Sequence, residues 1–179
     1  MSVPEFSRPE RIDTIGEGER EVAVSASAEE RAALAVRFGL KAIDRLEGKF
    51  RIRRDAAGIV ARGNVQADVV QACVVTDEPI PVSVDEPVAL RFVADDEPAG
   101  EEVELSEDAL DTISFDGAAI DLGEAAADTM ALALDPFPRG PNAAAVLKQA
   151  GVISEEEAKP LGALAGLAGL KAQLEKGQS

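Results

Sequence analysis

The chain has 179 residues, with no His, no Trp, no Tyr and one Cys, and 34 acidic against 18 basic side chains give it a net charge of −16. Without histidine, Ser-His-Asp and Cys-His catalytic groups and imidazole zinc ligands are excluded, and one cysteine excludes an internal disulfide and a multi-cysteine metal site. The 46% apolar content is sufficient for a hydrophobic core, so we expect a globular domain.

The N-terminal ten residues contain acids, Arg8 and two prolines where a signal peptide would have an apolar run. No later stretch offers the roughly 18 uninterrupted apolar residues that a membrane helix needs. We therefore expect a cytoplasmic protein with no membrane partner.

The first predicted elements are a short strand over residues 20–25 and a helix over residues 28–38. Ser27 precedes Glu30 by three residues, which is the spacing of a capping box at a helix N-terminus. Gly39 follows the last apolar residue of this run, where a glycine typically ends a helix.

Strand patterns then occupy residues 43–54, 59–76 and 80–92. The turn residues at 55–58 predict a hairpin between the first two strands, and the sequence at 77–79 predicts a second reversal. Pro81 and Pro87 cannot donate to a ladder, so parts of the third strand should lie at a sheet edge.

A second helix is predicted over residues 122–134, with Asp121 as its N-cap and Pro136 beyond its end. A short helix at 143–150 and a leucine stripe from Leu161 to Leu174 follow. The predicted fold is α+β: an antiparallel sheet, open or barrel-like, with two packed helices. Residues 1–138 should form the domain and residues 139–179 a helical C-terminal extension.

Charge is distributed in blocks. Residues 63–138 contain one basic and 19 acidic side chains, whereas the flanking segments are nearly neutral. An acidic loop is expected near residues 94–102, either as a solvated loop that only aids solubility or as a docking surface for a basic partner. Six acidic side chains form the candidate surface: Asp95, Asp96, Glu97, Glu101, Glu102 and Glu104.

The opposite charge gathers at residues 49–54, where cations alternate with apolar residues. On a strand this period of two places Lys49, Arg51 and Arg53 on one face and Phe50 with Ile52 on the other. Together with Arg54, these cations could contact RNA phosphates. Alternatively, they form the solvent face of an ordinary amphipathic strand that acids on neighbouring strands balance.

No motif predicts catalysis or a cofactor. Glycine-rich phosphate loops and EF-hand loops are absent from the sequence, so we expect a non-enzymatic protein without a metal or other cofactor. Cys73 lies in a valine-rich run without cations nearby, which is typical of a small buried side chain rather than a reactive thiolate.

Three patches together resemble the YceD family, the large ribosomal RNA subunit accumulation proteins. The patches are Gln71-Ala-Cys-Val-Val-Thr76, then Ile120-Asp-Leu-Gly-Glu124 leading into Leu132-Ala-Leu-Asp-Pro-Phe-Pro138, and the segment that begins Lys159-Pro-Leu-Gly. The resemblance implies a non-enzymatic cytoplasmic protein that supports accumulation of large-subunit (23S) ribosomal RNA, in a family often encoded beside a large-subunit ribosomal protein.

The matched positions in these patches are Cys73, Thr76, Asp121, Leu122 and Glu124. Many relatives have Cys-x-x-Cys where this chain has Cys73 and Thr76, so a cysteine-based metal site does not carry over and a structural role is expected.

Two binding hypotheses follow. In the first, the acidic surface binds a basic ribosomal protein, since a chain of net charge −16 repels RNA phosphates. In the second, the cationic strand at residues 49–54 contacts precursor ribosomal RNA or a pre-ribosomal particle directly.

Overall fold

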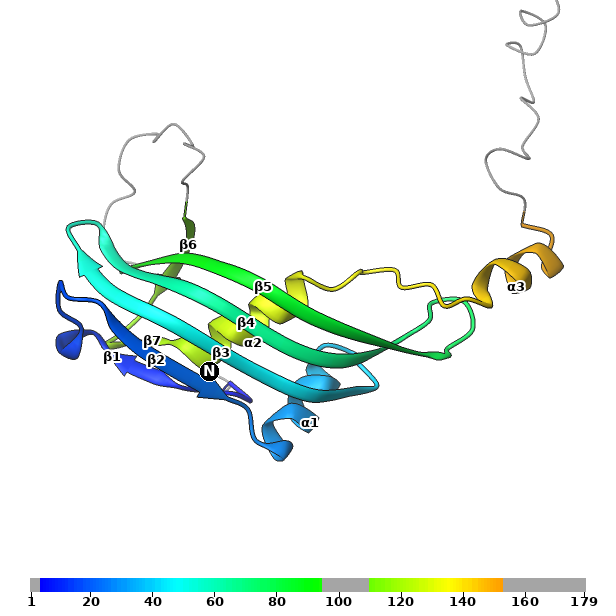
Figure 1. The fold of residues 1–179 in the computed structure, drawn as a ribbon, viewed down its shortest axis with the longest axis horizontal. Helices are drawn as coiled ribbons and strands as arrows, with labels where there is room; N and C mark the ends of the chain where they lie inside the picture. The colour runs from blue at the N-terminus through cyan, green and yellow to red at the C-terminus, as the bar shows by residue number, and fades with distance from the viewer. Residues whose placement is uncertain (1–3, 95–109, 153–179) are drawn as a thin grey trace, which may run out of the picture.

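The structure, a computed structural model, describes residues 4–94 and 110–152. Its main element is a five-stranded sheet in the spatial order β2-β3-β4-β5-β6. The strands are β2 (Arg20–Ser25), β3 (Ala42–Asp55), β4 (Gly58–Ala72), β5 (Pro79–Ala94) and β6 (Asp111–Phe115). Figure 1 shows the long, curved strands β3, β4 and β5 side by side.

The sheet is antiparallel from β2 to β5, but β6 runs parallel to the end of β5. Within the described residues β2 and β6 are its two edges, so the sheet is open and no barrel closes. The prediction of an α+β fold with a mainly antiparallel sheet is confirmed, whereas the barrel-like alternative is not seen.

Two three-residue strands, β1 (Pro9–Arg11) and β7 (Ala119–Asp121), form a separate antiparallel ribbon. A 3-10 helix (Ile12–Thr14) follows β1. The sequence predicted neither these strands nor β6, because so short a run carries too few residues to show a period.

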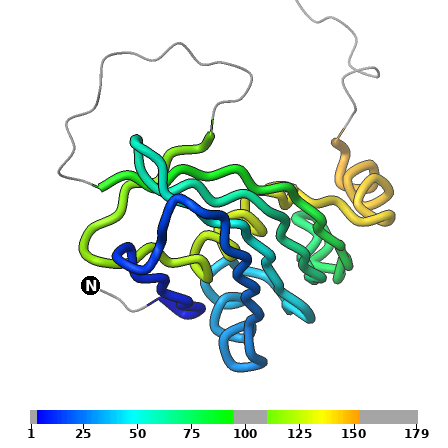
Figure 2. Tube along the Cα trace, turned by 60° about the vertical axis from the view of Figure 1, so that its left-hand side comes forward, coloured from blue at the N-terminus to red at the C-terminus, as the bar shows by residue number. Residues whose placement is uncertain are grey.

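Helices α1 (Ala28–Arg37) and α2 (Leu122–Leu132) lie on the same side of the main sheet (Figures 1 and 2). The inward side chains of the strands form the core with them, including Phe50, Ile52 and Leu34, each at most 1% exposed. The opposite face of the sheet is left to solvent by the elements that the structure describes. This open face carries the cations that were predicted to lie together.

The predicted helix starts are confirmed. The Ser27 hydroxyl accepts from the Glu30 N–H while the Glu30 carboxylate accepts from the Ser27 N–H at 2.7 Å, which completes the capping box. Asp121 caps α2 by accepting from the N–H groups of Gly123 and Glu124. Gly39 adopts a φ of +66° just beyond α1, a left-handed conformation that favours glycine.

The third predicted strand does contain an edge segment. In the described part of the chain, β6 pairs with β5 only over residues 90–94, so Pro81 and Pro87 lie where β5 pairs with β4 alone. The second predicted strand ends early, at Ala72 rather than Thr76, because residues 73–77 turn back and the Asp77 N–H donates to the Cys73 carbonyl at 2.9 Å.

A third helix, α3 (Ala143–Gln149), follows an extended stretch after α2. The leucine stripe from Leu161 to Leu174 lies outside the described residues. None of the helices in the described ranges is long and apolar enough to cross a membrane.

Candidate interaction surfaces

The predicted acidic surface cannot be placed. All six of its candidate residues lie outside the described residues: Asp95, Asp96, Glu97, Glu101, Glu102 and Glu104. The described strands on either side of these residues, β5 and β6, pair with each other in parallel over residues 90–94 and 111–115.

The cationic stripe has the predicted alternation. Lys49 and Arg51 are exposed on the open face of β3, while Phe50 and Ile52 point into the core at 1% and 0% exposure. The period of two arises because successive side chains of a strand point to opposite faces.

Arg62 joins this stripe from the neighbouring strand. It is the register partner of Arg51 and is exposed. Because register partners point to the same face, two guanidinium side chains stand next to each other across β3 and β4. Sequence reasoning missed Arg62, although the hairpin predicted at residues 55–58 fixes this register and could have revealed it.

Arg54 does not join the other three cations. Its position places it on the opposite side of β3, and its guanidinium donates to the backbone carbonyls of Ile12 and Ile15. Arg54 therefore holds the N-terminal loop against β3. Arg53 lies on the open face, 4.0 Å from a carboxylate oxygen of Asp55.

Most other arginines near the sheet are bound by acids. Arg91 contacts Asp55 at 2.7 Å, and this guanidinium is the main reason why the pKa of Asp55 lies below its usual range. Arg45 contacts Asp68 at 2.8 Å. By contrast, Lys49, Arg51 and Arg62 have no carboxylate within 4.0 Å among the residues that the structure describes. We call these three residues the cationic cluster.

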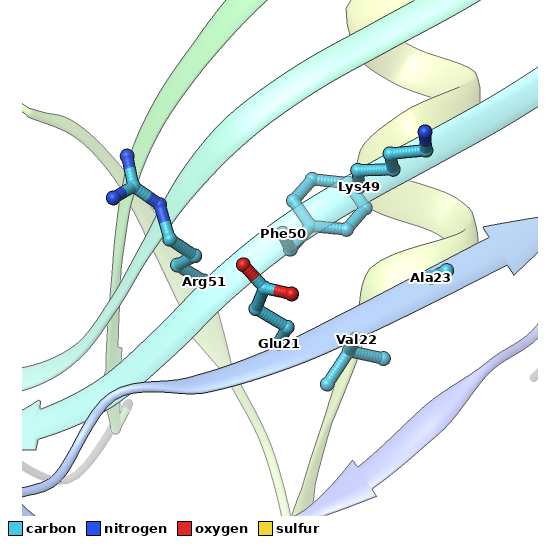
Figure 3. A pocket seen from close by; sticks show the side chains of 6 residues that line it. All are labelled: Glu21, Val22, Ala23, Lys49, Phe50 and Arg51. Carbon is cyan, nitrogen blue, oxygen red and sulfur yellow. The ribbon is translucent and has the colours of Figure 1, made fainter.

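A shallow hollow of about 410 Å³ lies between β2 and β3 beside the cationic cluster. Figure 3 shows Lys49 and Arg51 extending from β3, with Glu21 of β2 below them. Glu21 is the register partner of Arg51 and moderates the local positive charge, although it forms no ion pair within 4.0 Å with any residue that the structure describes. The hollow is open and partly apolar, and among the described residues its charged lining consists of Glu21, Lys49 and Arg51.

Two of the three patches that carry the family resemblance lie against each other. The Val74 N–H donates to the Pro138 carbonyl and the Gln71 side chain donates to the Asp135 carbonyl, each at 2.9 Å. The Gly140 N–H donates to the Cys73 sulfur at 3.3 Å. These patches therefore join the turn after β4 to the segment after α2.

Cys73 is 3% exposed, as expected for a buried side chain. Hydrogen bonds from the Thr76 side chain and from the Gly140 N–H lower the pKa of its thiol to about 7. Because these donors are neutral, the lack of local cations in the sequence did not reveal this effect. The same hydroxyl proton can alternatively be donated to a Glu78 carboxylate oxygen, at 3.0 Å, and the hydroxyl oxygen accepts from the Glu78 N–H, which braces the turn.

The remaining motif positions organise α2. Leu122 is fully buried, Asp121 caps the helix, and Glu124 binds Arg37 of α1 at 2.7 Å. In the described ranges, no three His, Cys, Asp or Glu residues are close enough together to hold a metal ion. The motif residues in the described ranges thus make contacts that hold the turn after β4 and the start of α2 in place.

A family model described as "Large ribosomal RNA subunit accumulation protein YceD" matches residues 61–171. The match covers more than half of the chain, and the chain belongs to this family. No curated protein and no solved structure matches it. The matched range contains Arg62, Cys73 and the acidic block, whereas Lys49 and Arg51 precede it.

Proposed function

We propose that this chain is a non-enzymatic cytoplasmic factor that supports accumulation of large-subunit (23S) ribosomal RNA by binding a basic ribosomal protein, free or within a pre-ribosomal particle. The family supports the role in ribosomal RNA accumulation. The observation that carries the choice of partner is the excess of 19 acidic over one basic side chain in residues 63–138.

The described part of this block contains one cation, Arg91. Arg91 is bound by Asp55 at 2.7 Å, so it does not neutralise the acids of the block. Asp85 is exposed and accepts hydrogen bonds from Asn64 and Gln66, which are neutral, so its negative charge persists. Such a field attracts a cationic protein over several ångströms and repels nucleic acid phosphates.

A pull-down from cell lysate tests this proposal, with nuclease-treated and untreated arms at low and moderate salt. We expect recovery of a basic large-subunit ribosomal protein that survives nuclease. Replacing Asp95, Asp96, Glu101 and Glu102 by Lys should abolish this recovery. Undiminished recovery with that variant would contradict docking through the acidic segment.

A control variant separates local charge from total charge. Replacing four exposed acids of residues 1–62 by Lys changes the net charge by the same amount and should leave recovery nearly intact. These four acids are Glu17, Glu19, Glu29 and Asp44.

A second candidate function is direct contact with precursor ribosomal RNA. The observation that favours it is the cationic cluster, where Lys49, Arg51 and Arg62 form no ion pair with any acid in the described part of an acid-rich chain. This contact would be to phosphates and largely independent of base sequence, since aromatic stacking side chains are absent from the cluster. Recovery of ribosomal RNA or particles that are lost after nuclease treatment would favour this candidate over the first.

A further inference from the structure

A second hollow, of about 440 Å³, lies between α2 and the region where β6 joins β5. Its apolar lining includes Val88 and Leu90 of β5, Ile113 of β6 and Ala125 of α2. Val88, Leu90 and Ala125 belong to the buried core, so the hollow reaches down to the core surface. We call it the α2–β5 groove; in Figure 1 the end of α2 passes behind β5 on the side where β6 lies.

Among the described residues, every charged side chain that lines this groove is acidic. Glu86 comes from β5, Asp111 from β6 and Asp128 from α2. Arg37 contacts Asp128 at 3.3 Å, but the same guanidinium also binds Glu5 and Glu124. Burial raises the pKa of Asp128, and the carboxylate of Glu124 adds to that effect, as is typical where negative charge is incompletely balanced.

An apolar side chain also stands open at the rim of the groove. Leu132 lines it and is 87% exposed. Beside it, residues 86–89 of β5 pair with β4 but, within the described residues, with no strand on the other side. An apolar surface next to a free strand edge is a common setting for peptide recognition.

We infer that the α2–β5 groove binds a peptide segment of a basic protein in which apolar side chains are flanked by Lys or Arg. This inference rests on the proposed function and names the site and the kind of segment. The apolar side chains contact Val88, Ile113 and Leu132, and the flanking cations lie against the three carboxylates. The same carboxylates repel an RNA phosphate or an anionic lipid, so charge complementarity selects the cationic peptide.

Fluorescence anisotropy with labelled synthetic peptides and the full chain tests the inference. The probe is Lys-Arg-Leu-Val-Leu-Arg-Lys. One comparison peptide replaces its three apolar residues by Ser, and the other replaces its four cations by Glu. We expect both to bind at least about tenfold more weakly than the probe, because each lacks one half of the complementarity. Equal binding of the Ser peptide would show attraction by charge alone and would overturn the inference.

A matched pair of variants locates the binding. Leu132→Ser should weaken probe binding about tenfold by removing apolar contact. Val36→Ser in α1 is the control, since Val36 is 85% exposed and does not line the groove. Both side chains are already in solvent, so neither change should lower the unfolding temperature noticeably. Equal probe binding by the two variants would overturn the inference.

A second pair of variants tests the contribution of the carboxylates. The groove variant combines Glu86→Gln, Asp111→Asn and Asp128→Asn. The control combines Glu17→Gln, Glu19→Gln and Glu29→Gln, which lie outside the groove. The groove variant should lose probe affinity and the control should retain most of it. If the groove variant binds as well as the control while a circular dichroism melt shows it folded, the groove is not the site.

The lysate experiment distinguishes failure of the groove inference from failure of the proposed function. If the unaltered chain recovers a basic ribosomal protein after nuclease treatment and the groove variants recover it equally, the function stands and the groove is excluded. If the unaltered chain recovers none, the proposed function fails as well.

Discussion

Arg51 of β3 and Arg62 of β4 are direct register partners on the open face of the sheet. Like charges at opposed positions of an antiparallel pair destabilise it, and other surface arginines of this chain avoid the problem by binding acids. A chain with 34 acidic side chains has ample means to neutralise such a pair. Glu21 faces Arg51 from β2 without an ion pair within 4.0 Å, so the repulsion between Arg51 and Arg62 is only partly compensated and is expected to cost stability.

Replacing Arg62 by Gln should raise the free energy of unfolding by about 0.2–1 kcal/mol, because it removes the repulsion from Arg51. Urea denaturation measures this gain. If the second candidate function holds, the same variant should bind ribosomal RNA more weakly and with a shallower dependence on salt. A variant that is less stable than the unaltered chain would contradict the reading of this pair as repulsive.

Arg54→Gln is the matched control for that experiment. Arg54 donates to the carbonyls of Ile12 and Ile15, so its loss should lower stability. It lies apart from the cationic cluster, so RNA binding should change little. The two variants should thus shift stability in opposite directions, and only Arg62→Gln should weaken RNA binding.

The ionisation of Glu30 makes the stability of the fold depend on pH. Both of its carboxylate oxygens accept from Arg8, at 2.7 and 2.8 Å, and one accepts from the Ser27 N–H. The Arg8 hydrogen bonds, helped by Ser27, lower the pKa of Glu30 from 4.5 to about 2. A carboxyl with a lowered folded-state pKa stabilises the fold fully above its unfolded pKa and loses that contribution as the pH falls through the folded value.

Glu30→Gln should therefore be less stable than the unaltered chain by about 1 kcal/mol at neutral pH, because the charged pair is partly exposed and solvent screens it. The gap should narrow as the pH falls from about 4.5 toward 2, in the window that this pKa shift sets. Urea denaturation at a series of pH values measures it. Glu29→Gln, at the exposed neighbouring position, should show no such gap at any pH; a gap that stayed constant in acid would contradict the role of Glu30 ionisation.

The sequence was most informative where structure depends on neighbours along the chain. The starts of the two main helices were predicted from Ser27 with Glu30 and from Asp121 with Glu124, because a helix cap is formed by residues close together in the sequence. The alternation around Phe50 placed Lys49 and Arg51 on one face for the same reason. The hairpin turn at residues 55–58 determines the β3–β4 register, so the pairing of Arg62 with Arg51 could also have been predicted.

Features that depend on distant contacts were not predictable. The β1–β7 ribbon pairs Pro9 with Asp121, and neither strand has a pattern without its partner. Arg54 looked like another exposed cation, because nothing nearby in the sequence shows that the carbonyls of residues 12 and 15 would meet it. The acids of the α2–β5 groove come from three separate elements, so only the fold brings them together.

Asp121 ties the N-terminal segment to α2. Besides capping the helix, its carboxylate accepts from the Arg8 N–H at 2.8 Å and from the Ser7 hydroxyl. Asp121→Ala should cost about 1–3 kcal/mol of unfolding free energy, more than a simple cap, because several donors lose one acceptor. Amide exchange at Arg8 should also accelerate. Asp116→Ala, at an exposed turn position, is the control, and equal stability of the two variants would exclude this tie.

The two buried glycines beside the motif positions should respond differently to alanine. A Cβ on Gly123 would lie 2.5 Å from the Phe6 carbonyl oxygen and 3.0 Å from the Arg8 nitrogen, both backbone atoms that can yield only if the N-terminal segment moves away from α2. A Cβ on Gly140 would meet Glu78 and Cys73 no closer than 3.5 Å, which is ordinary contact. Gly123→Ala should therefore lower the unfolding free energy by about 1–3 kcal/mol and Gly140→Ala should be nearly neutral, as judged by urea denaturation of both variants. The opposite order would mean that the N-terminal segment does not pack on α2 as closely as described and that the turn around Cys73 is the tighter contact.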